Sequence, residues 1–99
     1  MGLFGNLFKS TPAVDLKTLI SNGALLLDVR SKGEFAGGHA SGSKNIPLDE
    51  LTGKLSKLDK SKPIVAVCAS GMRSGTAVNI LKNNGFTEVY NGGSWTKYM

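Results

Sequence analysis

The chain has 99 residues, of which 40% are hydrophobic and 19% are charged, and its formal net charge is +5. These values are ordinary for one small globular domain, and no segment approaches the roughly 20 apolar residues of a membrane-spanning helix. A single cysteine excludes an internal disulfide and fits a reducing compartment, so we expect a cytoplasmic protein. The lysines are scattered and not interleaved with stacking aromatic residues, which favours small anionic substrates over nucleic acid.

The first half of the chain is predicted to alternate between helices and strands. Thr11-Pro12 is typical of a helix start, because a hydroxyl caps the helix and proline suits its first turn. Residues 24–29 are apolar without alternation, as in a strand that is buried on both faces of a parallel sheet. A capping-box pattern over residues 31–34 then predicts a short helix, and residues 45–47 predict a very short strand.

The second half continues this alternation. Leucines at helical spacing predict a helix over residues 48–58, in which Gly53 is a weak point. The apolar residues 63–67 predict another buried strand, and a helix follows over residues 74–83. Residues 88–90 predict the last strand, before a pair of glycines and a short tail. Strands that alternate with helices in this way predict an α/β fold with a mostly parallel sheet.

Cys68 is the most informative residue of the chain. It follows the apolar strand of residues 63–67 and begins a loop of small residues that leads into a helix. In parallel α/β sheets, ligands bind outside the carboxyl ends of the strands. Backbone N–H groups and the positive end of a helix favour the thiolate, which is the reactive form of cysteine. A lone cysteine at a strand end is often only a small buried hydrophobic residue, but the composition of this loop favours a reactive thiol.

The loop around Cys68 is suited to holding negative charge. Gly71 permits an unusual backbone conformation and a close approach, and Arg73 offers a permanent cation. Ser70 and Ser74 can each contribute a hydroxyl group. We therefore expect the pKa of the thiol to be lowered toward neutrality and a charged adduct on its sulfur to be stabilised.

Four motifs occur in order along the chain. They are Leu27-Asp28-Val29-Arg30 with Glu34-Phe35, residues 39–42 with Asn45-Ile46-Pro47, residues 67–74, and Gly85-Phe86 with Gly92-Gly93. In these motifs the chain resembles the single-domain rhodaneses, which are thiosulfate-type sulfurtransferases. The resemblance covers residues 11–99 and leaves residues 1–10 as an N-terminal extension. It implies a rhodanese-like α/β fold, with a small, mostly parallel sheet of four to five strands flanked by helices on both faces.

The resemblance implies a two-step sulfur transfer in which Cys68 is the catalytic residue. Its thiolate takes a sulfane sulfur from thiosulfate or a related persulfide donor and becomes a persulfide, which passes the sulfur to cyanide, a thiol or a protein. The loop that would bind the substrate and the persulfide consists of Ala69, Ser70, Gly71, Met72 and Arg73. The resemblance implies no metal and no organic cofactor, and we expect a monomer.

The spacing from Cys68 to Arg73 separates sulfur transfer from a close alternative. It is Cys-x4-Arg, whereas cysteine phosphatases use a Cys-x5-Arg loop whose arginine clamps phosphate. In the rhodanese-like family the six-residue loop goes with sulfur transfer, and a longer loop with phosphatase and arsenate reductase relatives. A non-catalytic binding module is a further alternative, because rhodanese-like domains also occur as inactive scaffolds. A thiol-disulfide oxidoreductase is disfavoured, since the chain has no second cysteine to resolve a mixed disulfide.

The other motif residues are expected to support the site. We expect a second layer of residues around the loop, made of Asp28, Arg30 and Ser74. Asp28 and Arg30 are predicted to be structural, through hydrogen bonds to the loop and an ion pair between Arg30 and Glu34. His39 is the only histidine, and we expect it to be structural, because a thiol with a lowered pKa needs no base.

The two ends of the chain carry apolar residues. Those within residues 3–8 have helical spacing, and we expect them to pack on the surface of the domain or to fray. The segment lacks the basic start and the cleavage site of a signal peptide. Trp95 and Tyr98 are expected to cover the core or the sheet edge. Trp95 comes earlier than the usual tryptophan of the family, so the resemblance does not define the path of the C-terminal tail.

Overall fold

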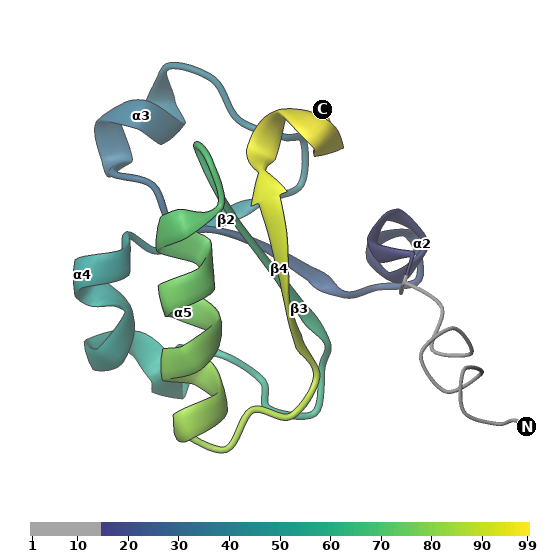
Figure 1. Cartoon of the computed structure of the whole chain (residues 1–99), viewed down its shortest axis with the longest axis vertical. Helices are drawn as coiled ribbons and strands as arrows, with labels where there is room; N and C mark the ends of the chain where they lie inside the picture. The colour runs from purple at the N-terminus through teal and green to yellow at the C-terminus, as the bar shows by residue number, and fades with distance from the viewer. Residues whose placement is uncertain (1–14) are drawn as a thin grey trace, which may run out of the picture.

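A four-stranded parallel sheet forms the centre of the molecule (Figure 1). The computed structural model describes residues 15–99. The strand order is β2-β1-β3-β4, and all neighbouring strands are parallel. The strands are β1 (Leu25–Asp28), β2 (Lys44–Asn45), β3 (Ile64–Cys68) and β4 (Val89–Ser94). The predicted alternation of strands and helices, and the parallel sheet, are thereby confirmed.

Helices cover both faces of this sheet. They are α2 (Leu16–Ser21), α3 (Lys32–Ala36), α4 (Leu48–Leu51) and α5 (Met72–Asn83), together with the 3-10 helices η1 (Thr52–Lys57) and η2 (Trp95–Tyr98). Residues of α4, η1 and α5 pack into the larger apolar core on one face, and residues of α2 and η2 pack on the other (Figure 1). The helix α3 lies near the end of the molecule where β3 passes into α5 (Figure 1).

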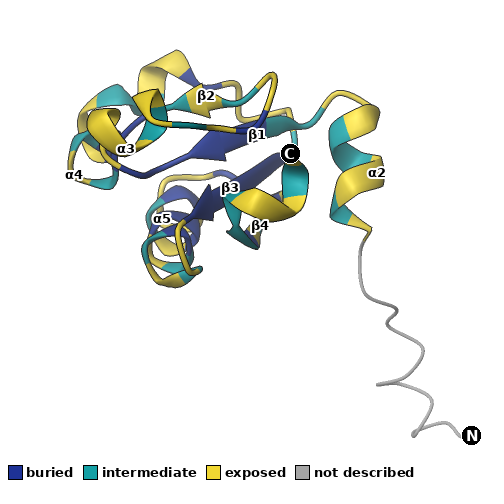
Figure 2. Ribbon diagram, turned by 90° about the horizontal axis from the view of Figure 1, so that it is seen from above, coloured by how far each residue is buried: buried dark blue, intermediate teal, exposed yellow. Residues whose placement is uncertain are grey.

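Both faces of β3 are buried, which explains its continuous apolar sequence (Figure 2). Ile64, Ala66 and Cys68 belong to the larger core, whereas Val65 and Val67 belong to the smaller one. This assignment follows the alternation of side chains along a strand. The side chain of Cys68 therefore lies on the same face of the sheet as α5.

The predicted helix over residues 48–58 is not one α-helix. The α-helical part ends at Leu51, and a 3-10 helix continues through Gly53. Glycine has a low helix propensity, so the tighter turns form at the predicted weak point. Leu55 and Leu58 still pack against the same core as Leu51.

The last strand is longer than predicted and contains the two glycines that were expected to follow it. The pairing with β3 shifts register at Gly92, because Asn91 pairs with Ala66 and Gly93 pairs with Val67. A Cβ atom on Gly92 would lie 2.8 Å from the side chain of Val65, so a side chain at this position would collide with the core. The bulge at Gly92 thus allows β4 to continue to the edge of the site.

The C-terminal tail turns directly back onto the sheet. Trp95 and Tyr98 pack against the smaller core, as expected, and the Tyr98 hydroxyl donates to the Gly92 carbonyl at 2.9 Å. The resemblance did not define how the C-terminal tail runs. In the structure the tail forms a short 3-10 helix from Trp95 to Tyr98.

The predicted helix start at Thr11-Pro12 and the N-terminal extension over residues 1–10 lie outside the described residues. The first described helix, α2, begins at Leu16 and is capped by Asp15, whose carboxylate accepts from the Thr18 N–H at 3.2 Å. Within residues 15–99, every helix is too short or too polar to cross a membrane.

A buried ion pair stabilises the carboxyl end of β1. Arg30 donates from Nη2 to Asp28 at 2.7 Å and to the Gly38 carbonyl at 2.8 Å, and the Trp95 ring covers its guanidinium at 4.3 Å. The predicted ion pair of Arg30 with Glu34 is wrong, because Arg30 reaches only the backbone carbonyl of Glu34. The Asp28 carboxylate is fully buried beside Arg30, whereas the Glu34 carboxylate is 39% exposed and binds Arg73.

We expect Asp28→Ala to destabilise the protein by about 3–5 kcal/mol, because it leaves the buried Arg30 without its counter-charge. The free energy of unfolding in urea measures this loss. Lys54→Ala is the control, since it removes the exposed pair of Lys54 with Glu50 and should cost only about 0.5 kcal/mol. Equal losses in the two variants would contradict the assigned role of the buried pair.

Candidate active site

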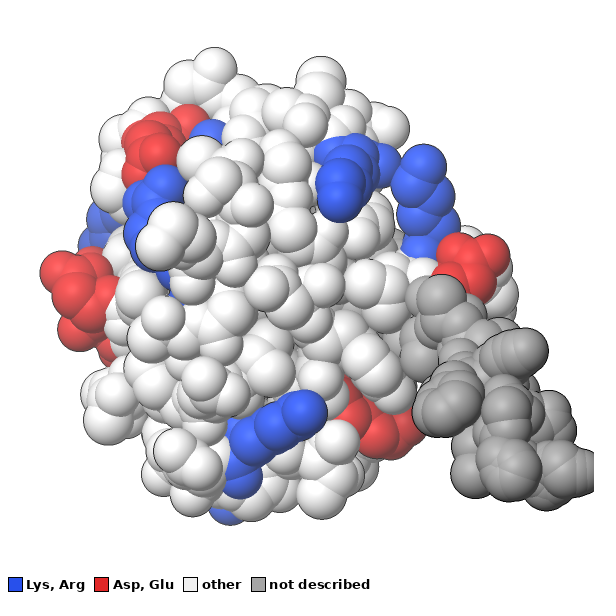
Figure 3. All heavy atoms as spheres, viewed as in Figure 1, with Lys and Arg blue, Asp and Glu red and all other residues white. Residues whose placement is uncertain are grey.

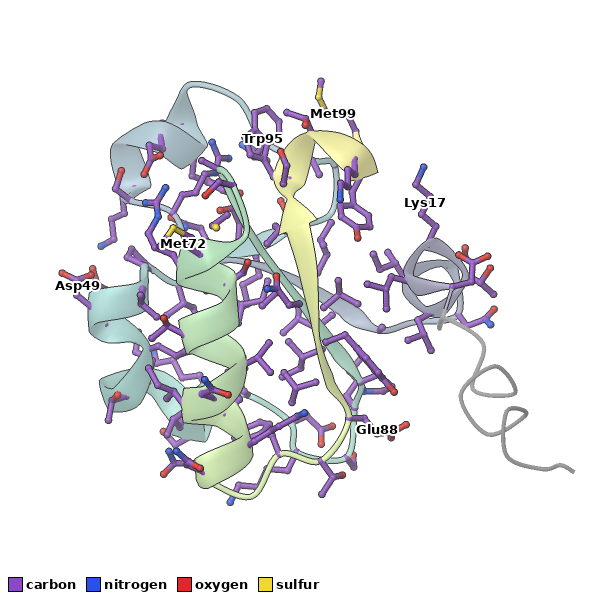
Figure 4. All side chains as sticks on the ribbon, in the orientation of Figure 1. Lys17, Asp49, Met72, Glu88, Trp95 and Met99 are labelled. Atoms are coloured by element: carbon purple, nitrogen blue, oxygen red, sulfur yellow. The ribbon has the colours of Figure 1, made fainter. Side chains whose placement is uncertain are left out.

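Cys68 is the last residue of β3, and only 1% of its surface is exposed. The loop that follows it turns at Gly71 into α5. Figure 4 shows Met72 at the start of α5 and Trp95 after β4, both at the end of the sheet where β3 finishes. The sequence prediction that Cys68 lies at the carboxyl edge of a parallel sheet agrees with this placement.

Three groups of the loop and of α5 surround the sulfur of Cys68. The Gly71 N–H donates to it at 3.0 Å and the Ser74 N–H at 3.4 Å, and the Ser74 hydroxyl lies 3.5 Å away. Gly71 has a φ of 106°, a conformation that side chains other than glycine rarely adopt, and this turn directs its N–H back to the sulfur. The N-terminus of α5 adds partial positive charge at the same point.

These groups determine the pKa of the Cys68 thiol. Burial raises this pKa, whereas hydrogen bonds from the Ser74 hydroxyl and from the N–H groups of Ser74, Gly71 and Ser70 lower it. The hydrogen bonds outweigh burial, and the pKa is lowered to about 7. At neutral pH the Cys68 side chain is therefore a thiolate in about half of the molecules, and the thiolate is the nucleophilic form of cysteine.

Arg73 is held by an ion pair with α3. Its guanidinium donates to both oxygens of Glu34, at 2.7 and 3.0 Å, and both side chains are 39% exposed. The Arg73 guanidinium, together with the Ser31 N–H, lowers the pKa of Glu34 to about 2. This bidentate pair connects the loop to α3, and it neutralises the cation expected at the mouth of the site.

The loop residues differ in how close they come to the sulfur. Ser74 contacts it directly and is therefore nearer than the sequence analysis placed it. Met72 is 80% exposed, so its side chain is not part of the buried surroundings of the sulfur. Asp28 and Arg30 bind each other at the end of the neighbouring strand. Within residues 15–99, neither side chain hydrogen-bonds to Cys68.

Two further motif residues have structural contacts. His39 stacks on Phe35 with the ring centroids 3.7 Å apart, and its Nδ1 lies 2.8 Å from the Phe35 carbonyl. The Asn45 side chain donates to the carbonyls of Asp28 and Arg30, each at 2.9 Å. It thereby fixes the chain that leaves β1.

Sequence reasoning missed Asn91 of β4, which hydrogen-bonds to Gly71 and Ser74 at the start of α5. An asparagine before two glycines is typical of a turn, and nothing in the sequence indicates that it reaches a loop twenty residues away. Its contact depends on the register of β4, which only the three-dimensional structure provides.

A family model described as the rhodanese-like domain matches residues 12–99. The chain belongs to this family. It is 44% identical over 68 residues to the uncharacterized protein YqhL of Bacillus subtilis (strain 168). That match covers 69% of this chain and 54% of YqhL, so the chain spans about half the length of that relative.

Two further rhodanese-like relatives have named activities. The thiosulfate sulfurtransferase GlpE of Stutzerimonas stutzeri (strain A1501) is 34% identical over 83 residues, which are 84% of this chain and 76% of GlpE. The solved structure of the human single-domain sulfurtransferase TSTD1 matches with a TM-score of 0.71 and 29% identity, over 89% of this chain and 95% of that one. The chain is thus similar to sulfurtransferases over most of its length.

The rate of alkylation of Cys68 by iodoacetamide should rise with pH with a midpoint near 7, because only the thiolate reacts. We expect Ser74→Ala to move this midpoint to higher pH by up to about one unit, since a hydrogen bond to a charged group contributes about 1.5 kcal/mol. Thr76→Ala is the matched control, because the Thr76 hydroxyl is on the same helix but faces the Met72 carbonyl. A midpoint unchanged by Ser74→Ala would show that Ser74 does not stabilise the thiolate.

Proposed function

We propose that this rhodanese-like protein is a sulfurtransferase that carries a sulfane sulfur on Cys68. The observation that carries the proposal is a buried cysteine sulfur that accepts hydrogen bonds from Gly71 and Ser74 and has a pKa of about 7. The similarity to thiosulfate sulfurtransferases supports the same assignment. The proposed functional unit is residues 11–99.

In the first step the Cys68 thiolate attacks the outer sulfur of thiosulfate, a small anionic donor. A sulfur–sulfur bond forms on the enzyme, the sulfur–sulfur bond of thiosulfate breaks, and sulfite leaves with the bonding electrons. The product is a persulfide whose outer sulfur carries negative charge at neutral pH. The backbone N–H groups of the loop from Ala69 to Arg73 bind this anion in the proposed mechanism. They lie at the positive end of α5.

In the second step an acceptor attacks the outer sulfur of the persulfide. Cyanide forms thiocyanate in this way, while a thiol or a protein cysteine becomes a persulfide in turn, and the Cys68 thiolate is released. The chain has one cysteine, so the acceptor is another molecule. A reactive thiol persists in a reducing compartment, which favours the cytoplasm as the place of this reaction.

The ion pair of Arg73 with Glu34 argues against phosphate chemistry. A cysteine phosphatase uses its loop arginine to clamp two phosphate oxygens. Here the edge of the guanidinium formed by Nη1 and Nη2 is taken by the Glu34 carboxylate. A loop one residue shorter also suits a single sulfur atom better than a tetrahedral phosphate.

Intact-mass measurement after incubation with thiosulfate tests the proposal directly. We expect an increase by one sulfur atom, which cyanide removes with formation of thiocyanate. Cys68→Ser should show neither the adduct nor turnover, while its circular dichroism spectrum stays that of the wild type. A protein that acquires no removable sulfur is a non-catalytic member of the family, and hydrolysis of a phosphate ester in its place would favour the phosphatase alternative.

The Glu34 carboxylate should weaken the binding of an anionic donor, because it neutralises Arg73. We expect Glu34→Gln to lower the KM for thiosulfate by up to about fivefold at low salt, since interactions between exposed charges are weak and are screened by salt. Glu88→Gln makes the same change of charge at the opposite end of the sheet, before β4 (Figure 4), and should leave KM unchanged. An equal fall in both variants would indicate an effect of net charge alone.

A further inference from the structure

Asn91 connects the last strand to Gly71 and Ser74 at the start of α5. Its Nδ2 donates to the Gly71 carbonyl at 3.0 Å, and its Oδ1 accepts from the Ser74 hydroxyl at 2.6 Å. The Gly93 N–H also donates to Oδ1, at 3.0 Å. One exposed side chain on the edge strand β4 therefore contacts the two residues whose N–H groups bind the sulfur of Cys68.

These three hydrogen bonds fix which way the Asn91 amide faces. A carbonyl can only accept and a backbone N–H can only donate, so Nδ2 must face Gly71 and Oδ1 must face Gly93. Oδ1 then also faces the Ser74 oxygen, and a contact of 2.6 Å between them requires a proton, which only Ser74 can supply.

The direction of this proton matters for Cys68, because the Ser74 hydroxyl has only one. While it points to Asn91, the Ser74 oxygen presents lone pairs to the sulfur 3.5 Å away. That arrangement suits a neutral thiol, which donates its proton to Ser74. It does not suit a thiolate, for which the hydroxyl must turn and give up its bond to Asn91.

We propose that Asn91 is a positioning residue that competes with the Cys68 sulfur for the proton of the Ser74 hydroxyl. Asn91 thereby limits how strongly the site stabilises negative charge on sulfur. A thiolate that is stabilised too strongly is a weak nucleophile, and the best attacking thiol titrates near the ambient pH. The catalytic meaning of this competition rests on the proposed sulfur transfer, but the competition itself concerns only the charge on Cys68.

Gly75 provides an independent structural argument for this contact. It lies inside α5, where glycine is less favourable than alanine. A Cβ atom at this position would lie 3.3 Å from Nδ2 of Asn91, which is tighter than an ordinary contact. The glycine thus leaves the room in which the Asn91 side chain crosses the start of the helix.

The test is a double-mutant cycle on the pH dependence of Cys68 alkylation by iodoacetamide, which requires no sulfur transfer. We expect Asn91→Ala to lower the midpoint by about half a pH unit, because the Ser74 hydroxyl becomes free to donate to the thiolate. In the Ser74→Ala background the same substitution should produce no shift. Asn91→Leu, which keeps the size of the side chain, should act like Asn91→Ala.

Asn84→Ala is the matched control, because Asn84 is an exposed asparagine whose side chain donates to the Ile80 carbonyl at the other end of α5. Thermal unfolding monitors the fold of each variant. A raised or unchanged midpoint in Asn91→Ala would overturn the proposal, and so would equal shifts in both backgrounds, which would mean that Asn91 acts through Gly71. If the cycle behaves as expected but no persulfide forms with thiosulfate, the proposed function fails and the competition for the proton stands.

Discussion

The hydrogen bond from the Gly71 N–H to the Cys68 sulfur is the interaction on which the site depends. It requires the chain to reverse within three residues of the end of β3, and the left-handed conformation of Gly71 makes this possible. The same turn starts α5 and brings the Ser74 N–H to the sulfur. Because β3 is buried on both faces, its end is fixed by the core, and the sulfur cannot move away from these donors.

The second constraint is the close approach of β4 to this turn. A Cβ atom on Gly71 would lie 3.4 Å from the Cα of Gly93, so the loop packs directly on the backbone of the last strand. Asn91 keeps the regular register of β4, and the bulge at Gly92 comes directly after it, before Gly93. The glycine pair near the C-terminus is thus part of the architecture of the site, although it is far from Cys68 in the sequence.

The features that could be predicted from the sequence are those that depend on neighbouring residues. The strand before Cys68, the capping box of α3 and the loop before α5 are local patterns, and the structure contains each of them. The contacts of Asn91 and the partner of Arg73 depend on how distant segments meet, and periodicity carries no information about that. The ion pair of Arg30 was predicted with the wrong acid, because the Glu34 carboxylate binds Arg73, which is 39 residues away in the sequence.

The two arginines of the motifs are both neutralised by carboxylates, and this determines where the site obtains its positive potential. Arg30 is buried against Asp28, and Arg73 is bound by Glu34. Figure 3 shows that the Lys and Arg side chains visible in that view lie in separate small groups and not in one patch. The charge on the Cys68 sulfur is therefore balanced by the Ser74 hydroxyl, by backbone N–H groups and by the end of α5, which all act at short range. Such donors stabilise a compact anion, which fits the single negative charge that the proposed transfer places first on the Cys68 sulfur and then on the outer sulfur of the persulfide.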